Sequence, residues 1–342
     1  MKIAVLTGGG DCPGLNAVIR AAVRRGYKHY QDEVVGALDG WRGLMDNELE
    51  PLTIDRLRGT LPRGGTVLGT SRINPFATDD GVELVRKTIS DEKIDAIIAI
   101  GGEGTLSCTN RLYEMGFPVV GVPKTIDNDI GITERTFGFD TAVTIASDAI
   151  DRLHTTAESH NRVMVVEVMG RHVGHIATWA GIAGGATRTL IPEEPFDIDE
   201  VCASLTRRHL AGRYASIVVV AEGAKPLPGT MDIPDDEWDQ FGHIRLGGIA
   251  NRVAAEIEKR TGYETRVTVL GHVQRGGTPT PFDRVLSTRF GVAAIDAVHD
   301  GDYGMMVALQ SDKIVRVPLA DDVAELKGVS PELWDVAQQF FS

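Results

Sequence analysis

The chain opens with Lys2-Ile3-Ala4-Val5-Leu6-Thr7, continues with Gly8-Gly9-Gly10-Asp11-Cys12-Pro13-Gly14, and then shows a helical pattern over residues 15–30. The same order of apolar run, glycine-rich turn and helical pattern recurs from residues 94 and 163. Continuous apolar runs are typical of strands buried on both faces, and their alternation with helices predicts a mainly parallel α/β sheet. Such sheets bind ligands beyond the carboxyl ends of their strands, which is where these turns lie.

Size and charge narrow the class of protein. The 342 residues predict about two domains, and the net charge of −13 predicts a surface that repels nucleic acid and anionic membranes. The apolar runs are too short to span a bilayer, and strand residues follow Met1 directly, so we expect neither a membrane anchor nor a signal peptide. Three widely spaced cysteines fit a reducing compartment. We therefore expect a cytoplasmic protein that binds neither nucleic acid nor membrane.

The first glycine loop, residues 8–14, allows two interpretations. It precedes a helix whose free N–H groups favour phosphate oxygens, and glycine lets the backbone approach an anion closely. A purely structural strand–turn–helix connection is an equal alternative. Pro13 stands where a dinucleotide fingerprint has its third glycine, and the chain contains no Gly-Lys pair, which excludes a P-loop of the Walker type.

The segment Pro123-Lys124-Thr125-Ile126-Asp127-Asn128-Asp129 is the most informative, because it follows an apolar run and carries two carboxylates. One carboxylate can accept a proton from a substrate hydroxyl, while the other helps to hold a divalent cation. An Asp/Asn turn without a ligand is the alternative. Glu103, a carboxylate at a neighbouring strand end, weakens that alternative.

Basic residues stand at further strand ends, several of them beside glycines. In an acidic protein this placement suggests oxyanion binding through charge-assisted and often bidentate hydrogen bonds. The residues are Arg72, Arg162, Arg171, Arg266, His272 and Arg275.

Taken together, these segments resemble the bacterial-type phosphofructokinase family over nearly the whole chain. The matching stretches are Gly9-Gly10-Asp11-Cys12-Pro13-Gly14-Leu15-Asn16, Arg63-Gly64-Gly65-Thr66, residues 101–105 and 125–129, Val166-Glu167-Val168-Met169-Gly170-Arg171, Ala221-Glu222-Gly223 and Val269-Leu270-Gly271-His272-Val273-Gln274-Arg275-Gly276-Gly277. They come in the family's order and at about its spacing.

The resemblance implies two Rossmann-like α/β domains with mainly parallel sheets and an active site in the cleft between them. We expect a larger domain of residues 1–138 plus 274–324 that binds the phosphoryl donor. A smaller domain of residues 139–273 plus 325–342 would bind the sugar phosphate. The implied reaction transfers a phosphoryl group from MgATP to the 1-hydroxyl of fructose 6-phosphate, giving fructose 1,6-bisphosphate in glycolysis.

The resemblance also implies roles for individual residues. Asp127 would be the general base, with Thr125, Arg72 and Arg171 as further catalytic residues, and Glu103 and Asp129 would hold Mg²⁺. ATP would be bound by Gly10, Arg72, Ile73, Gly102, Glu103, Gly104 and Thr105. Fructose 6-phosphate would be bound by Thr125, Ile126, Asp127, Arg162, Met169, Gly170, Arg171, Glu222, Arg266, His272, Val273, Gln274 and Arg275. In the family's homotetramer, Arg162 and Arg266 would reach in from a neighbouring subunit.

The choice of donor depends on two residues that point in opposite directions. Pyrophosphate users in the family usually carry an acidic residue at the position of Gly104, where it would collide with the α-phosphate of ATP, so glycine favours ATP. Lys124 instead resembles the pyrophosphate users. We give Gly104 more weight, because a steric and electrostatic block excludes ATP whereas an added cation does not.

Other functions are alternatives at this point. A pyrophosphate-dependent phosphotransferase is the first, and a catalytically silent nucleotide-binding regulatory subunit is another, since fold does not imply function. Activity on another ketose phosphate is compatible with the sequence. A dehydrogenase is disfavoured by the missing fingerprint. Residues 226–244 form an insertion relative to short bacterial members, with no function assigned to it.

Overall fold

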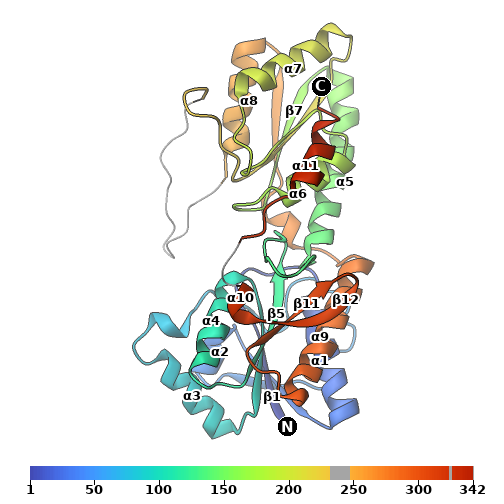
Figure 1. Ribbon diagram of the computed structural model, residues 1–342. Coiled ribbons are helices and arrows are strands. Elements are labelled where there is room, and N and C mark those ends of the chain that lie inside the picture. The colour runs from blue at the N-terminus through green and yellow to red at the C-terminus, as the bar shows by residue number, and fades with distance from the viewer. Residues whose placement is uncertain (232–246, 323–325, 342) are drawn as a thin grey trace. The chain divides into compact units, whose positions relative to one another are not determined.

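The computed structural model describes residues 1–231, 247–322 and 326–341. The chain divides into two compact units and passes between them three times. Unit 1 comprises Met1–Thr141 and Arg275–Leu326, and unit 2 comprises Ala142–Gln274 and Lys327–Ser342. Both are α/β units with mainly parallel sheets, which confirms the predicted fold class (Figure 1). The assignment of donor and sugar binding to separate domains stays a prediction.

The sheet of unit 1 has the strand order β12-β11-β5-β4-β1-β2-β3, with β6 paired to β5. The central strands β1, β4 and β5 pair in parallel and are buried almost throughout, as their continuous apolar sequences predict. Only the outer pairs β2–β3 and β11–β12 are antiparallel. The strands are β1 (Lys2–Thr7), β2 (Glu33–Ala37), β3 (Leu49–Pro51), β4 (Ala96–Gly101), β5 (Val119–Thr125), β6 (Phe137–Gly138), β11 (Met305–Gln310) and β12 (Lys313–Pro318).

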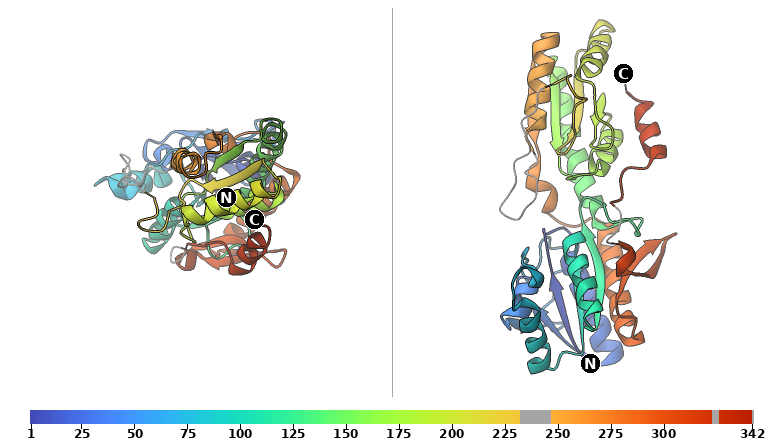
Figure 2. Two further views of the ribbon diagram at one scale, coloured as in Figure 1. Left: turned by 90° about the horizontal axis from the view of Figure 1, so that it is seen from above. Right: turned by 60° about the vertical axis from the view of Figure 1, so that its left-hand side comes forward.

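Helices cover both faces of this sheet (Figures 1 and 2). On one face lie α1 (Leu15–Arg25) and α9 (Pro281–Asp300), and on the other lie α2 (Trp41–Met45), α3 (Gly81–Glu92) and α4 (Glu103–Glu114). The short elements are η2 (Pro75–Ala77) and α10 (Leu319–Asp322). Gly291 lets α1 and α9 pack closely, since a Cβ there would lie 2.4 Å from the carbonyl oxygen of Val18. The predicted helix over residues 15–30 changes to the π-helical turn η1 (Gly26–Tyr30) for its last five residues.

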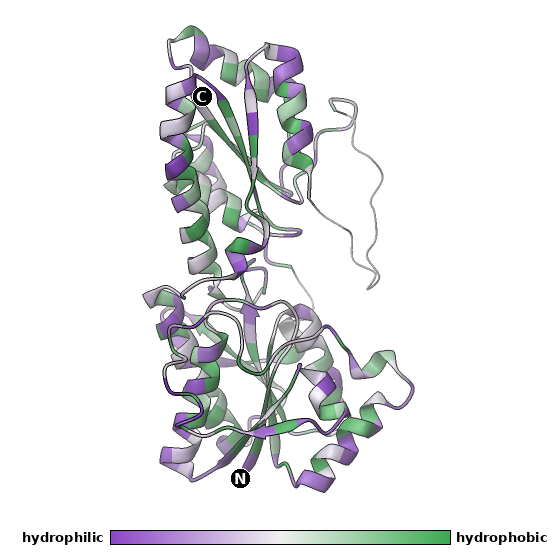
Figure 3. Ribbon diagram, turned by 180° about the vertical axis from the view of Figure 1, so that it is seen from behind, coloured by the Kyte–Doolittle hydropathy of each residue, from purple (hydrophilic) through white to green (hydrophobic). Residues whose placement is uncertain are grey.

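Unit 2 contains a four-stranded parallel sheet in the order β10-β7-β9-β8. Its strands are β7 (Val163–Val168), β8 (Arg188–Leu190), β9 (Ser216–Ala221) and β10 (Thr265–Val269). Its helices are α5 (Phe139–His160), which begins in unit 1, α6 (His175–Ala183), α7 (Ile198–Leu210), α8 (Ile249–Thr261) and α11 (Pro331–Gln338), with the 3₁₀ segment η3 (Gly271–Arg275). Figure 3 shows that the strands of both units are largely apolar.

Parallel pairing gathers the loops of each unit at one edge of its sheet. In unit 1, Thr7 pairs with Ile100 and Gly101 with Pro123, so the loops that follow β1, β4 and β5 share one edge. In unit 2, the loops after β7, β9 and β10 share an edge in the same way. Of the insertion, residues 232–244 lie outside the described residues. No helix in the described ranges is long and apolar enough to cross a membrane.

Candidate active site

The glycine loop of unit 1 is built around a buried cation. The side chain of Lys124, at the end of β5, is buried, and its Nζ donates a hydrogen bond to the carbonyl oxygen of Gly10. Burial lowers the pKa of the Lys124 ammonium, Arg275 lowers it further, and Asp127 and Asp129 oppose these shifts. A positive group therefore lies directly under the loop that sequence analysis connected with phosphate. The sequence pointed to Lys124 for donor choice, but not to this support of the loop.

Arg275 is the second cation at the same loop. Its Nη1 donates to the carbonyl oxygen of Asp11 at 3.2 Å, and a Cβ at Gly10 would lie 2.6 Å from this nitrogen. Any side chain at position 10 would therefore displace the guanidinium. Arg275 was predicted to bind the sugar phosphate, and the structure brings it against the predicted donor loop, within unit 1.

The loop after β5 holds the candidate general base in a fixed turn. Thr125 Oγ1 accepts the backbone N–H of Asp127 at 3.0 Å. Thr136 donates its hydroxyl to the carbonyl oxygen of Thr125 at 2.8 Å and its N–H to Asn128 Oδ1 at 3.1 Å. Asn128 adopts a left-handed φ of 55°. The Asp127 carboxylate is buried within this turn. The two interpretations of the segment, an Asp/Asn turn and a positioned carboxylate, are therefore compatible.

Glu103 and Asp129 lie at this edge with oxygen donors suited to magnesium. Glu103 is exposed in the first turn of α4, and Asp129 is half-buried. Mg²⁺ is usually bound through one or two carboxylates and completed by water and phosphate oxygens. Within the described part of the chain no cluster of three or more His, Cys, Asp or Glu side chains could hold a metal by itself. The residues present fit Mg²⁺ bound together with substrate phosphates, and this site stays a prediction.

The remaining predicted donor residues surround the same loop. The carbonyl oxygen of Ser71 accepts the N–H of Gly9 at 2.9 Å. Arg72 and Ile73 are the next two residues of the chain, so they lie close to the loop, and both are exposed. Thr105 is buried, and a Cβ at Gly8 would lie 2.5 Å from its hydroxyl. Gly102 caps the start of α4. Gly104 is exposed, and a Cβ there would meet nothing within 4 Å.

In unit 2, the turn after β7 is strained and is held by a carboxylate. Gly170 has a φ of 144° and Arg171 a φ of 50°, a left-handed conformation that an arginine rarely adopts. Glu222, directly after β9, accepts the backbone N–H groups of both residues on one oxygen, at 3.2 and 3.0 Å. The predicted contact of Glu222 with the sugar stays a prediction. In the structure, Glu222 holds the backbone of the turn.

The segment after β10 is attached to the same turn. Gln274 is fully buried, accepts the N–H of Met169 at 3.3 Å and donates to the carbonyl oxygen of Gly271 at 3.1 Å. His272 and Val273 are exposed. The Gln274 amide therefore holds this segment beside Met169. In unit 1, Ile126 is fully buried, and its contact with the sugar phosphate stays a prediction.

Arg162 and Arg266 do not lie with these residues. Arg162 precedes β7 and Arg266 is the second residue of β10, so both stand at the amino end of the sheet, opposite to Arg171. Both guanidinium groups pair with Glu264, that of Arg162 at 2.7 Å. The six residues of β7 span about 20 Å at roughly 3.3 Å each. Within one chain, Arg162 and Arg171 therefore cannot bind the same phosphate group.

Two of the matching motifs have structural roles that sequence reasoning missed. Asn16 donates to the carbonyl oxygens of Arg63 and Gly64 at 3.1 and 3.2 Å and accepts the N–H of Val67 at 2.8 Å. A Cβ at Gly64 would lie 2.2 Å from the carbonyl oxygen of Gly277. The Arg63-Gly64-Gly65-Thr66 motif therefore forms a tight turn against the segment after Arg275. The signal available in the sequence was that Asn16 and residues 63–66 both belong to the stretches that resemble the family.

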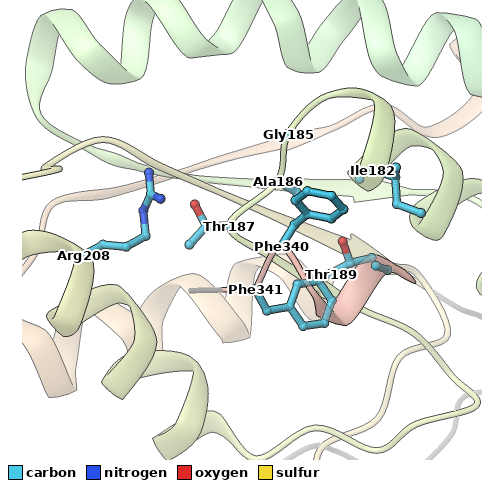
Figure 4. A pocket seen from close by; sticks show the side chains of 10 residues that line it. Ile182, Gly185, Ala186, Thr187, Thr189, Arg208, Phe340 and Phe341 are labelled. Atoms are coloured by element: carbon cyan, nitrogen blue, oxygen red, sulfur yellow. The ribbon is translucent and has the colours of Figure 1, made fainter. Parts of the chain in front are cut away.

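A cavity of about 240 Å³ lies elsewhere in unit 2. Figure 4 shows Arg208 on one side of it and the aromatic rings of Phe340 and Phe341 on another. None of the residues predicted to bind a donor or a sugar lines this cavity. It is therefore separate from the candidate site.

Comparison with known proteins gives the class and then the family. The family model described as phosphofructokinase matches residues 2–298. The chain is 58% identical over its full length to a pyrophosphate–fructose 6-phosphate 1-phosphotransferase of Streptomyces coelicolor. It is 57% identical to an ATP-dependent 6-phosphofructokinase of Mycobacterium tuberculosis, and each pair covers 100% of both chains. These relatives define a phosphotransferase that acts on an alcohol group. The chain belongs to the phosphofructokinase family.

Solved structures agree with this assignment. The phosphofructokinase of Saccharomyces cerevisiae superposes with a TM-score of 0.81 at 33% identity, over 99% of this chain and 46% of that one. This chain therefore spans about half the length of the yeast chain.

The contact between Glu222 and the strained turn generates a first prediction. Glu222→Ala should raise KM for fructose 6-phosphate about 10- to 100-fold, because a hydrogen bond to a charged group contributes roughly 1.5–3 kcal/mol. Glu222→Gln keeps an oxygen acceptor and should stay within about threefold of the wild type. Steady-state kinetics at saturating donor measure both. If the Gln variant is as impaired as the Ala variant, the charge of Glu222 acts on the ligand and not on the turn.

Proposed function

We propose that this chain is a 6-phosphofructokinase that transfers a phosphoryl group from MgATP to the 1-hydroxyl of fructose 6-phosphate, giving fructose 1,6-bisphosphate. The observation that carries the proposal is the edge of unit 1 where Lys124 and Arg275 contact the glycine loop near the buried Asp127. Such an arrangement suits a polyphosphate next to a proton acceptor. Family membership supports the same reaction class.

Phosphoryl transfer asks a protein mainly to position its substrates and to offset charge. The glycine loop, Lys124 and the first turn of α4 would bind the donor phosphates. Asp127 would accept the proton of the attacking hydroxyl, held in place by Thr125. Glu103 and Asp129 would hold Mg²⁺, which when bound offsets negative charge on the phosphates.

We infer that the loops of unit 2 would bind the sugar phosphate. Arg171 would contribute a guanidinium presented by the strained turn, and Arg72 a second one from unit 1. Arginine suits this task because its planar fork matches phosphate oxygens in a bidentate manner.

The loss of the general base is the second prediction. Asp127→Ser should lower kcat by about 10²- to 10⁴-fold, the usual contribution of positioned acid–base catalysis, with KM for the sugar phosphate within several-fold. Asp127→Asn, which keeps the shape of the side chain, should lose as much. Near-normal turnover in either variant would contradict the role of Asp127.

ATP is the proposed donor because of the space at Gly104. A Cβ at this exposed position meets nothing within 4 Å, so neither bulk nor charge opposes the α-phosphate of a nucleotide. Lys124 is compatible with ATP, since its ammonium, hydrogen-bonded to the Gly10 carbonyl oxygen under the glycine loop, would attract the terminal phosphates of either donor. Pyrophosphate is the alternative donor, and relatives of similar identity carry either name.

The donor is tested by comparing kcat/KM for ATP and for pyrophosphate with Mg²⁺ and fructose 6-phosphate saturating. We expect ATP to be used and pyrophosphate to give little or no product. Gly104→Asp should lose a large part of ATP use, whereas Gly104→Ala should retain it because the space is open. A higher kcat/KM for pyrophosphate would reassign the donor. No product with either donor would favour a silent regulatory subunit.

We further propose a homotetramer in which active sites are shared between subunits. Arg162 stands about 20 Å from the Arg171 turn within one chain, and Arg266, which pairs with Met164, lies at the same opposite edge of the sheet. Arginines at that edge are suited to a sugar phosphate bound by a neighbouring copy, with Glu264 as their partner before it binds.

Subunit exchange tests this arrangement. Arg162→Ala and Asp127→Ser oligomers should each have low activity, and their hybrids should regain it in about one site in four if subunits mix at random. Native mass spectrometry verifies the exchange and the number of subunits. Hybrids that stay as inactive as both parents after verified exchange would mean that each site is built within one chain.

A further inference from the structure

A buried carboxylate lies beside the candidate site without a role in the proposed reaction. Asp283, in the first turn of α9, is 0% exposed. Its Oδ2 accepts both the backbone N–H and the hydroxyl of Thr141, at 2.8 and 2.5 Å. These contacts join the start of α9 to the first turn of α5.

The hydrogen bonds continue from Thr141 to the loop before α9. The Thr141 hydroxyl, while donating to Asp283, accepts the N–H of Thr280 at 3.0 Å. The Thr280 hydroxyl donates to Asp140 at 2.6 Å and accepts the N–H of Asp283 at 3.2 Å. Thr280 and Asp283 therefore each make two hydrogen bonds with residues at the start of α5.

This junction also touches the glycine loop. A Cβ at Gly138 would lie 2.8 Å from Cys12 Sγ, and a Cβ at Gly14 would lie 2.5 Å from Ser287 Oγ, one turn beyond Asp283 on α9. Three segments of unit 1 therefore meet around the first turns of α9: the glycine loop, which contacts Gly138 and Ser287, the segment that leads into α5, and the segment of residues 275–283. The last of these carries Arg275 at its other end.

We propose that Asp283 is a positioning residue for phosphoryl transfer: its ionised carboxylate, acting through Thr141 and Thr280, holds the segment that places Arg275 against the glycine loop. The donors are ordered along one path, from the Thr280 N–H to the Thr141 hydroxyl to Asp283 Oδ2. An ionised acceptor at the end of this path strengthens each bond in it. This role rests on the proposed function.

The charge state of Asp283 changes within an accessible pH range. Burial raises the pKa of Asp283 to about 6, while the hydrogen bonds of Thr141 and Gly138 act against that rise. Two other titratable groups face it. Asp140 raises the pKa of Asp283 further, and Cys12 stays a neutral thiol because burial raises its own pKa strongly. We therefore expect the carboxylate to be ionised above pH 6 and neutral below it.

The activity test compares Asp283→Asn with the wild type from pH 5.5 to 8. The ratio of the two kcat/KM values for fructose 6-phosphate removes the titration of the sugar phosphate itself. We expect the variant to be about tenfold less active at pH 8, the loss of one charge-assisted hydrogen bond, and within about threefold at pH 5.5. Asp296→Asn, on the same helix but bonded to Arg25 and Tyr30, is the matched control and should show no pH trend.

Thr141 provides a second route if Asp283→Asn does not fold. Thr141→Ser keeps the hydroxyl and should retain most activity, whereas Thr141→Val keeps the shape, loses the hydroxyl, and should reproduce the loss at pH 8. A ratio for Asp283→Asn that is constant with pH, or equal impairment of both Thr141 variants, would overturn the proposal and leave Asp283 a purely structural residue.

Thermal unfolding separates this inference from the proposed function. The pKa of Asp283 in the folded protein lies above its ordinary value of 3.8, so the folded state binds more protons between about pH 4 and 6 and its stability falls as pH rises through that range. The Tm difference between wild type and Asp283→Asn should therefore shift in favour of the variant from pH 4 to 7, and a constant difference would refute the titration. An inactive wild type with either donor would refute the proposed function and this role, whereas an active wild type with a constant activity ratio would refute this role alone.

Discussion

The candidate site depends on a lysine ammonium buried under a backbone loop. Taking a cation out of water is costly unless other groups replace its solvation. At Lys124 the carbonyl oxygen of Gly10 and the nearby carboxylates Asp127 and Asp129 do so, although burial still lowers the pKa of the ammonium. The glycine loop, the end of β5 and the general-base loop are therefore electrostatically linked. Arg275 adds a second positive charge at the same loop, which favours the binding of an anion such as phosphate.

The sequence predicted the fold well where one physical signal was sufficient. Apolar runs without alternation located the parallel strands. The sequence predicted the candidate site less well, because the position of a site residue depends on the edge of the sheet at which it lies and on packing between distant segments. Arg162 and Arg266 precede or begin their strands, so they lie at the opposite edge from Arg171, and spacing along the chain does not display this. The buried side chain of Ile126 and the internal hydrogen bonds of Gln274 likewise depend on packing between segments distant in sequence.

Two features of the site reduce stability locally. Arg171 adopts a left-handed backbone conformation, which typically costs on the order of 1–3 kcal/mol and persists only where surrounding contacts fix it, here those of Glu222. Asp283 is a second case. Its raised pKa means that the ionised carboxylate is less stable in the folded protein than in water. An asparagine at position 283 would avoid that cost. Proteins commonly retain such unfavourable groups where activity requires them, and both lie beside residues predicted to bind phosphate.

Overall similarity does not determine the phosphoryl donor. The chain is 58% identical to a relative named for pyrophosphate and 57% identical to one named for ATP, a difference too small to decide. In the proposed reaction, either donor would present the same terminal phosphates to the glycine loop and Lys124, so most of the proposed site would be common to both. Only the part of a nucleotide beyond the β-phosphate distinguishes them. We propose that this part passes the first turn of α4, where a Cβ at Gly104 would meet nothing within 4 Å. On this proposal, a change at position 104 alone would alter the donor, while the fold, the proposed general base and the proposed sugar site would stay unchanged.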